Sequence, residues 1–137
     1  MRKIENLDNI LRQKGLRATA QRLMICDEIN KAGHIEIDNL YENLKKQIPS
    51  LSLATIYKNM HSLVKKEIIS EVNIKGRKTI YEMTTESHIH YICTECGVIE
   101  DIAFDTMALV DKISELSEKN ITDCKLTTFG LCTNCAN

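Results

Sequence analysis

The chain has 137 residues, of which 43% are hydrophobic and 27% charged, and its formal net charge is −1 at pH 7. This balance is typical of a globular protein of one domain or two small ones, and it excludes a disordered tail, a collagen-like repeat and a coiled coil. No apolar run approaches the roughly 20 residues that span a bilayer, and the charged start lacks the apolar core of a signal peptide. We therefore expect a cytoplasmic protein with no membrane partner.

Four apolar stripes at helical spacing predict four helices in the first part of the chain. The stripes are Ile4, Leu7 and Leu11; Leu23, Cys26 and Ile29; Ile37, Leu40, Tyr41, Leu44 and Ile48; and Ile56, Met60, Leu63 and Val64. Thr19 and Ser52 can cap the second and fourth helices, and Pro49 ends the third. Alternating residues at 71–74 and 79–83, around a turn at 75–78, predict a β-hairpin. This order of elements is that of a winged helix-turn-helix domain at 1–83.

The second part of the chain predicts a smaller unit with three strands and one helix. Residues 84–87 form a polar hinge, 88–93 and 98–102 are predicted strands, and 121–129 is a third. Leu109, Val110, Ile113 and Leu116 mark a helix between them. The predicted fold class is therefore α+β, with a winged helix-turn-helix domain followed by a small α/β domain at 88–137. A unit of about 50 residues buries little apolar surface alone, so we expect a metal, a partner subunit or both to stabilise it.

Charge and cysteine are distributed unevenly along the chain. Residues 1–83 contain 15 Lys and Arg against 10 Asp and Glu, a balance of +5, whereas residues 84–137 contain 3 against 9, a balance of −6. A basic first half favours a phosphate-bearing partner, although many solvated surfaces carry as much charge. Five of the six cysteines follow residue 90, and without a signal peptide they indicate metal or redox chemistry rather than disulfides.

Two Cys-x-x-Cys pairs, Cys93 with Cys96 and Cys132 with Cys135, are separated by 35 residues. Each pair can turn two thiolates toward one point, and two pairs complete the tetrahedral sulfur shell that suits Zn²⁺. The alternatives are unrelated thiols or a thioredoxin-like redox pair, and the presence of two matched pairs argues against both. The His-x-Glu signature of a zinc deaminase is missing. The spacing predicts a closed structural zinc site, whereas Cys26 is expected in the core.

A second group of metal-ligand residues lies around the first pair of cysteines. His88 and His90 share one face of a predicted strand, Glu82 lies on the preceding strand, and Asp101 follows Cys96. A shell of nitrogen and oxygen suits Fe²⁺, Mn²⁺ or Zn²⁺ and binds them more reversibly than four thiolates do. Spacing alone leaves open whether the two histidines bind metal or lie on the solvent face of an edge strand, and it leaves His34 as a loop residue.

The exposed face of the predicted fourth helix carries small, aromatic and basic side chains, namely Ala54, Tyr57, Lys58 and His61. Such a face suits the major groove of DNA, and a solvated surface is the alternative. Positive charge near the second helix, whose N-terminus can hold a phosphate, comes from Lys14, Arg17 and Arg22. The winged element order favours double-stranded DNA as the partner. The predicted contacts are Lys14, Arg17, Arg22, Ser52, Ala54, Thr55, Tyr57 and Lys58.

Four segments, at 15–22, 52–58, 88–96 and 129–135, resemble the ferric uptake regulator (Fur) family of bacterial metal-responsive transcription factors. The resemblance covers nearly the whole chain. It implies a homodimer with an N-terminal DNA-binding domain and a C-terminal dimerisation domain, in which the four cysteines hold structural zinc. It also implies a second, hinge-bridging metal, Fe²⁺ or Mn²⁺, that closes the dimer onto a palindromic operator. The positions that match the family's regulatory ligands are His34, Glu82, His88, His90 and Asp101.

The resemblance extends to one branch of the family. The positions of a further metal site found in many Fur proteins are here Ser87, Ile89, Ala108 and Cys124, none of which is the expected ligand. The pattern therefore resembles the peroxide-responsive repressor branch, which has one regulatory site. Asp101 supports this branch, because iron-sensing members tend to have Glu there, whereas Glu82 argues against it, because peroxide sensors usually have Asp at that position.

The sequence leaves three functions to be distinguished. The first is a metal-dependent DNA-binding repressor, which senses peroxide or, as the alternative, iron or zinc to control metal uptake. The second is a zinc-ribbon interaction module that does not bind DNA. The third is a metalloenzyme, which needs a substrate pocket and a catalytic motif that a chain this short does not offer. We predict the repressor, with no enzymatic activity and no small-molecule substrate.

Overall fold

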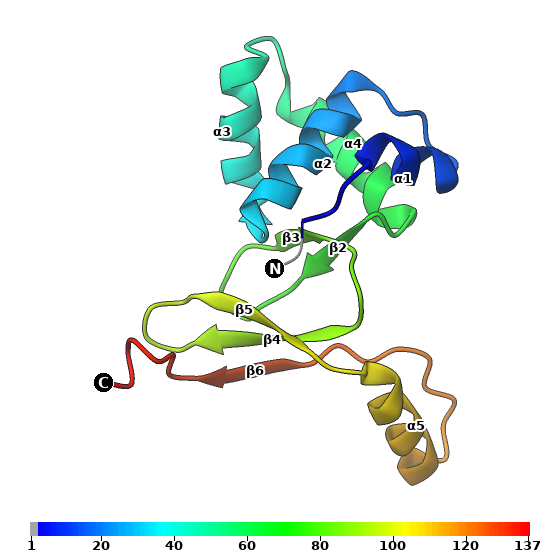
Figure 1. Ribbon diagram of the computed structural model, residues 1–137, viewed down its shortest axis with the longest axis vertical. Helices are drawn as coiled ribbons and strands as arrows, with labels where there is room; N and C mark the ends of the chain where they lie inside the picture. Colours follow the sequence, from blue (N-terminus) through cyan, green and yellow to red (C-terminus); the bar gives the residue numbers. More distant parts are fainter. Residues whose placement is uncertain (1–2) are drawn as a thin grey trace. The chain divides into compact units, whose positions relative to one another are not determined.

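The computed structural model describes residues 3–137, and the chain divides into two compact units, Met1–Thr84 and Thr85–Asn137. The first unit combines four helices with a small sheet and the second combines one helix with another, which confirms the predicted α+β class (Figure 1). Among residues 3–137, none of the helices combines the length and hydrophobicity that crossing a membrane requires.

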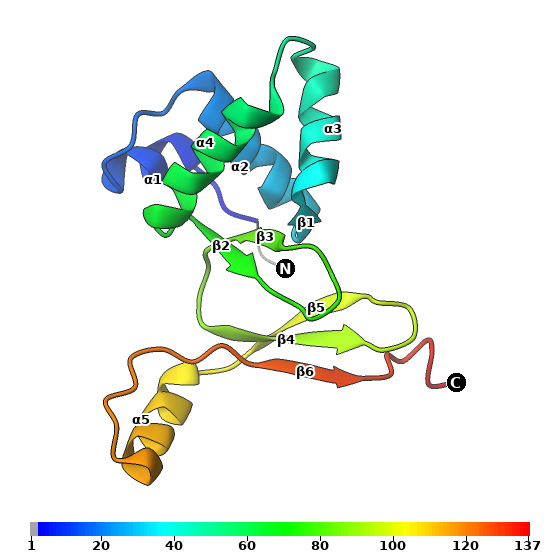
Figure 2. The ribbon, with the colours of Figure 1, turned by 180° about the vertical axis from the view of Figure 1, so that it is seen from behind.

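The first unit contains the predicted helices and hairpin. The helices are α1 (Leu7–Gln13), α2 (Ala20–Ala32), α3 (Ile37–Gln47) and α4 (Leu53–Lys65). The strands are β1 (Ile35–Glu36), β2 (Ile69–Val72) and β3 (Ile80–Met83), which form an antiparallel sheet in the order β1-β3-β2. Within this unit the helices gather on one side of the sheet (Figure 2).

Side-chain hydrogen bonds fix the starts of α2 and α4, as predicted. The Thr19 hydroxyl accepts a hydrogen bond from the backbone N–H of Arg22 at 3.3 Å, and the Ser52 hydroxyl accepts one from Thr55 at 3.1 Å. Each cap satisfies a backbone donor that the first helical turn leaves unpaired. The apolar faces that follow meet in one core, whose most deeply buried side chains are Leu11, Ile25, Cys26, Ile29, Leu40, Leu44, Ile56, Leu63 and, on β2, Ile69.

Three details of the first unit differ from the prediction. The first strand of the hairpin is Ile69–Val72 rather than 71–74, so the connection to β3 is longer than the predicted turn at 75–78. Ile4 lies before α1 rather than on its helical stripe, because the Asn30 side chain clamps its backbone. Asn30 donates to the carbonyl of Ile4 at 2.8 Å and accepts from its N–H at 3.0 Å, in the manner of a neighbouring strand. The short strand β1 was not predicted, since two residues between helices carry no recognisable period.

The second unit is built on a sheet in the order β5-β4-β6. Its elements are β4 (His88–Cys93), β5 (Ile99–Ala103), α5 (Thr106–Ser117) and β6 (Thr127–Gly130). β4 pairs antiparallel with β5 and parallel with β6, so α5 lies in the long connection that a parallel pair requires. Within this unit, α5 extends from one end of the sheet and the C-terminus lies at the other (Figure 1).

The predicted strand over 121–129 is wrong for its first six residues, because pairing with β4 begins only at Thr127. Earlier backbone groups bond locally instead. The N–H of Ile121 donates to the Ser114 hydroxyl at 3.2 Å, and the N–H of Cys124 donates to the Asp123 carboxylate at 2.9 Å. Such local bonds compete with a ladder, so the segment stays irregular.

The second unit buries few side chains for its size. Across 85–137, all of which the structure describes, the buried apolar residues are Ile89, Ile92, Cys93 and Val110. Large apolar side chains remain exposed on its surface, namely Val98, Ile102, Phe104, Met107, Ile113, Leu116, Leu126, Phe129 and Leu131. Leu116 is 73% exposed and Phe129 61%. An apolar surface of this kind is typical of a protein interface.

Candidate metal centres and DNA-binding surface

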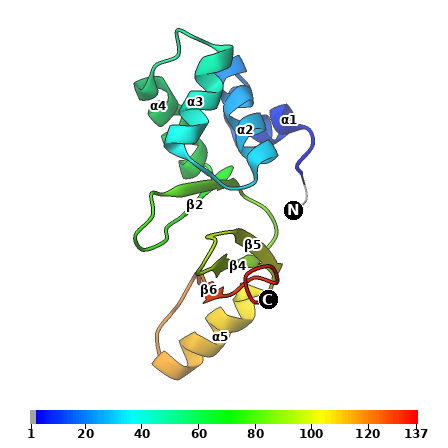
Figure 3. The same cartoon turned by 90° about the vertical axis from the view of Figure 1, so that its left-hand side faces the viewer.

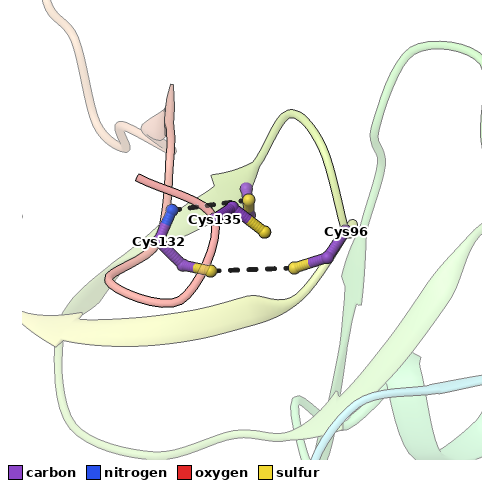
Figure 4. Close-up of side chains that lie close together, drawn as sticks. Cys96, Cys132 and Cys135 are labelled. Carbon is purple, nitrogen blue, oxygen red and sulfur yellow. Dashed lines mark hydrogen bonds between the residues drawn. The ribbon is translucent and has the colours of Figure 1, made fainter. Parts of the chain in front are cut away.

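The four cysteines of the two Cys-x-x-Cys pairs meet at one end of the second unit. Cys93 ends β4, Cys96 lies in the turn that follows, and Cys132 and Cys135 lie in the loop after β6. Their four Sγ atoms lie within 4.8 Å of one another. Figure 4 shows the sulfurs of Cys96 and Cys132 facing each other, at 3.8 Å. In a tetrahedral site with Zn–S bonds of about 2.3 Å, neighbouring sulfurs are about 3.8 Å apart.

Backbone hydrogen bonds shape the two cysteine turns. The N–H of Gly97 donates to the carbonyl of Cys93 at 3.0 Å, and the N–H of Cys135 donates to the carbonyl of Cys132 at 3.1 Å. Gly97 has a φ of 76°, which favours glycine at this position. The N–H of Cys132 also donates to the Sγ of Cys93 at 3.4 Å, which joins the two turns.

The thiols cannot all ionise without a cation. Backbone donors at Cys132 and Cys96 lower the pKa of Cys93 to about 6, whereas hydrogen bonds with the Cys132 and Cys96 side chains raise the pKa of Cys135 to about 12. Four thiolates this close together would repel one another. A divalent metal that is borderline soft and has no geometric preference of its own relieves that repulsion. The donor set and the spacing of the sulfurs therefore fit Zn²⁺, which would be held by all four thiolates.

His34 and Glu82 form a buried pair in the first unit. The Nε2 of His34 lies 3.0 Å from an Oε of Glu82, and the two side chains are 14% and 5% exposed. The sheet explains the pairing, because Ile35 lies opposite Tyr81, which brings the preceding residue to the position opposite Glu82. Among residues 3–137, Glu82 is the one charged residue in the buried class. Imidazole and carboxylate together offer a nitrogen and an oxygen to a divalent metal.

His88, His90 and Asp101 form a second donor set, which lies in the second unit. The two Nε2 atoms are 3.2 Å apart, and an Oδ of Asp101 lies 3.8 Å from the Nε2 of His88 and 3.5 Å from that of His90. The strand register accounts for this, because His90 pairs with Asp101 across β4 and β5. Two nitrogen ligands about 2.1 Å from one metal lie at a comparable separation.

A backbone carbonyl just before β4 fixes the orientation of the His88 ring. Nδ1 of His88 lies 2.8 Å from the carbonyl oxygen of Glu86, which can only accept a hydrogen bond. In a neutral imidazole the proton therefore resides on Nδ1, and the lone pair of Nε2 points toward His90. A backbone carbonyl that sets the tautomer of a histidine is a common support of metal ligands.

The predicted recognition face of α4 is exposed. Tyr57 is 50% exposed, Ala54, Lys58 and His61 are exposed too, and the opposite face packs Ile56, Met60 and Leu63 into the core. Ser52 and Thr55 are occupied with the helix cap, where their hydroxyls also bond each other at 2.8 Å. α4 therefore presents an aromatic and a basic side chain from a rigid helix.

An open hollow lies before α2, and Arg17 is the one predicted basic residue in its lining, which consists of Arg12, Gly15, Leu16, Arg17, Ala18 and Thr19. Lys14 and Arg17 are exposed, whereas Arg22 is partly buried. Nη1 of Arg22 donates to the carbonyl of Arg17 at 3.1 Å, so this guanidinium supports the loop before α2. Lys14 and Arg17 are therefore more exposed to solvent than Arg22.

The hairpin adds basic residues that the sequence reading assigned only to a turn. Lys75 and Arg77 flank Gly76, whose φ of 81° forms the turn, and Lys78 pairs with Asp38 on α3. Asn73 and Thr79 bond each other at 3.1 Å and hold the two ends of the turn together. In Figure 3 the loop after β2 projects on the side of the first unit where α4 lies.

Two thiols lie outside the quartet. Cys26 is completely buried on α2, as predicted, and burial raises the pKa of its thiol to about 12. Cys124 is partly exposed in the irregular segment before β6 rather than packed on a strand. Cys26 is therefore a core residue, and Cys124 is available as a control for the quartet.

Three comparisons relate the chain to known proteins. The model of the ferric uptake regulator family matches residues 13–129. The peroxide-responsive repressor PerR of Staphylococcus saprophyticus is 29% identical over 134 residues, which are 96% of this chain and 90% of that protein. The structure of the Campylobacter jejuni peroxide stress regulator matches with a TM-score of 0.75 at 33% identity. The match covers 95% of this chain and 99% of that one.

A further solved structure supports the fold alone. It is the ferric uptake regulator Fur of Helicobacter pylori, described as having three functional metal binding sites. It has a TM-score of 0.78 at 20% identity, and the match covers 100% of this chain and 98% of that one. Together with the family model, which spans most of the sequence, these likenesses show that the chain belongs to the ferric uptake regulator family.

Proposed function

We propose that the chain is a homodimeric, metal-dependent repressor that binds palindromic DNA and releases it when peroxide reaches a regulatory Fe²⁺. The observation that carries the proposal is the preassembly of the two donor sets, His34 with Glu82 and His88 with His90 and Asp101. The family consists of transcriptional regulators rather than enzymes. The cytoplasm, where genomic DNA lies, is the expected place of action.

We assign residues 1–83 to DNA binding, 84–87 to a hinge and 88–137 to dimerisation. The exposed Tyr57 and Lys58 on α4 support the first assignment, with Lys14 and Arg17 as phosphate contacts. We also assign contacts with the DNA backbone to the basic turn that contains Lys75 and Arg77. The exposed apolar side chains of the second unit support the last assignment, since a second copy would bury them.

A single metal bound by both donor sets would connect the DNA-binding unit to the dimerisation unit. The five ligands would be His34, Glu82, His88, His90 and Asp101. Such a bridge selects one orientation of the two units from those that the hinge allows. In a twofold dimer, one orientation fixes the distance between the two recognition helices, and a palindromic operator requires a fixed distance between its half-sites.

Peroxide sensing follows from the chemistry of this ligand set. These nitrogen and oxygen donors would hold Fe²⁺, which when bound would supply the reducing electrons for peroxide beside its own ligands. The net change is the transfer of one oxygen atom to a ligand histidine and the reduction of peroxide to water. His34 and His88 are the proposed targets, and an oxidised ligand would weaken metal binding and release the operator. The relatives named peroxide-responsive repressors support this reading.

Operator binding in the presence of each metal tests the function. We expect a promoter palindrome to shift in a mobility assay with Fe²⁺ or Mn²⁺ and not after chelation of the regulatory metal. Dilute peroxide should release the Fe²⁺ complex and spare the Mn²⁺ complex, because Mn²⁺ is a poor reductant of peroxide. Mass spectrometry should then find one added oxygen atom on His34 or His88.

The variant Asp101→Glu is the matched test of the sensing step, and we expect it to keep metal-dependent binding but respond less to peroxide. Three results would contradict the proposal. An Fe²⁺ complex that ignores peroxide would indicate an iron-responsive repressor, as would thiols that oxidise while both histidines stay intact. Failure to shift with any metal at any salt concentration would favour a zinc-ribbon interaction module.

Substitutions on α4 test the recognition face. Lys58→Ala should reduce the slope of log affinity against log salt by about 1, because one phosphate contact is lost. Tyr57→Ala should weaken operator binding by about tenfold and relax base preference, as expected for loss of a base contact of 1–3 kcal/mol. Titrations at several salt concentrations on operator and scrambled DNA measure both effects.

Lys119→Ala is the control for the charge change, since Lys119 is an exposed residue of the second unit. It should leave the salt slope unchanged. Metal affinity and melting temperature should be unchanged in all three variants, because the side chains lie outside the core and the donor sets. Wild-type binding by both α4 variants would place the recognition face elsewhere.

A further inference from the structure

Tyr91 lies beside the cysteine quartet without being one of its ligands. Side chains alternate along a strand, so Tyr91 and Cys93 share one face of β4, and His88 and His90 share the other. Cys93 pairs with Gly130 on the edge strand β6. A Cβ at Gly130 would lie 3.4 Å from Cε2 of Tyr91 and 3.5 Å from its hydroxyl oxygen. The Tyr91 ring therefore covers the glycine that leads into Cys132.

The hydroxyl of Tyr91 does not stabilise the fold through a hydrogen bond to another described residue. Within the described residues its oxygen is buried and makes no hydrogen bond. A buried hydroxyl without a partner is costly, and nearly all such groups in native proteins bond a protein atom, a water or an ion. Burial, followed by the negative charges of Cys93 and Cys132, raises the pKa of Tyr91. The hydroxyl oxygen lies beside Gly130, two residues before Cys132, on the face of β4 that also carries Cys93.

A zinc ion with four thiolates carries a net charge of two negative units, which hydrogen-bond donors around the sulfurs help to offset. The N–H of Cys132 is one such donor, to Cys93. We propose that the Tyr91 hydroxyl is another, that it donates to a thiolate of the zinc-bound quartet, and that it thereby strengthens zinc binding. The inference rests on the assignment of the quartet to structural zinc. Tyr91 is a positioning residue in this account and does not touch the metal.

The rival explanation of Tyr91 needs only its ring. An aromatic side chain that covers a glycine on an edge strand stabilises the sheet by packing. Phenylalanine would cover Gly130 equally well, because it differs from tyrosine only in the hydroxyl. Tyr91→Phe therefore separates the two roles. The matched control is Tyr81→Phe, which removes the hydroxyl of a tyrosine that is 8% exposed on β3 in the first unit.

The experiment uses the full chain loaded with Zn²⁺ or with Co²⁺. Competition with a chromogenic chelator should give about tenfold weaker zinc binding for Tyr91→Phe, the lower end of what loss of an outer-shell partner costs. The Co²⁺-thiolate charge-transfer band should move to longer wavelength, because a thiolate that has lost a hydrogen bond gives up an electron more easily. Tyr81→Phe should change neither quantity.

Other outcomes would overturn the proposal. If Tyr91→Phe keeps the zinc affinity and the band position of the wild type, the hydroxyl does not bond a thiolate, even if the melting temperature falls. In that case the repressor function and the zinc assignment both stand. If the wild-type protein shows no Co²⁺-thiolate band, the zinc assignment itself fails, and the role of Tyr91 fails with it.

Discussion

Cys93→Ser should abolish zinc binding and should dissociate or unfold the dimer. Cys93 is 1% exposed at the end of β4, and its unit buries few other apolar side chains. A structural zinc site contributes about 10–16 kcal/mol of binding free energy, which is comparable to the whole stability of a domain. Such a loss exceeds what the small core can supply. Zinc content, molar mass in solution and thermal unfolding would together measure the effect.

Cys124→Ser provides the control for Cys93→Ser, because it removes a thiol of the same unit that lies outside the quartet. We expect this variant to keep its zinc, its dimeric mass and a melting temperature close to that of the wild type. A Cys93→Ser protein that stays dimeric with an unchanged melting temperature would exclude a structural role for the quartet. Loss of zinc from Cys124→Ser would mean that the ligand set is wrong.

Much of the fold could be predicted because its local signals agree. Thr19 and Ser52 combine a helix cap with an apolar stripe that begins immediately afterwards, and both helices start at those residues. The strand over 121–126 could not be excluded from sequence, since alternation is a necessary and not a sufficient condition for pairing. Two local bonds prevent the pairing. The bond of Ile121 to Ser114 depends on where α5 ends, and the bond of Cys124 involves its neighbour Asp123.

The sequence predicts the residues of the candidate site better than it predicts the strand pairings that bring them together. Spacing brought His88 and His90 to one face of a strand, but their alignment with Asp101 depends on the register of β4 with β5. His34 meets Glu82 because β1 pairs with β3, and β1 carries no sequence signal. Tyr91 was not singled out at all, because a tyrosine in a strand is ordinary until its hydroxyl is found buried. What the assembled residues bind stays a prediction.

The strand β4 carries both predicted metal sites of the second unit on its opposite faces. His88 and His90 project to one side, and Cys93 projects to the other. β6, which leads directly to Cys132 and Cys135, pairs with β4 along the same residues, and the Thr128 hydroxyl donates to the carbonyl of His90 at 3.1 Å. A rigid zinc site would therefore hold the strand that presents the regulatory histidines.

His34→Ala should leave a folded, zinc-containing dimer whose operator binding no longer depends on the regulatory metal. The substitution removes the imidazole that lies 3.0 Å from Glu82 in the first unit and leaves His88, His90 and Asp101 in place. If one metal joins both sets, the remaining ligands can still bind it but cannot orient the DNA-binding unit. A ligand shifts a conformational equilibrium only by its difference in affinity for the two states, and that difference would be lost. Coupling between two sites typically changes affinity by about 5- to 150-fold, and the ratio of operator affinities with and without Mn²⁺ should fall from this range toward one.

His90→Ala, which removes a ligand from the second unit, should give the same loss, because a bridge fails from either side. Zinc content and molar mass would establish that both variants remain intact dimers. An undiminished Mn²⁺ response in His34→Ala would exclude His34 as a ligand and, with it, the bridge between the two units.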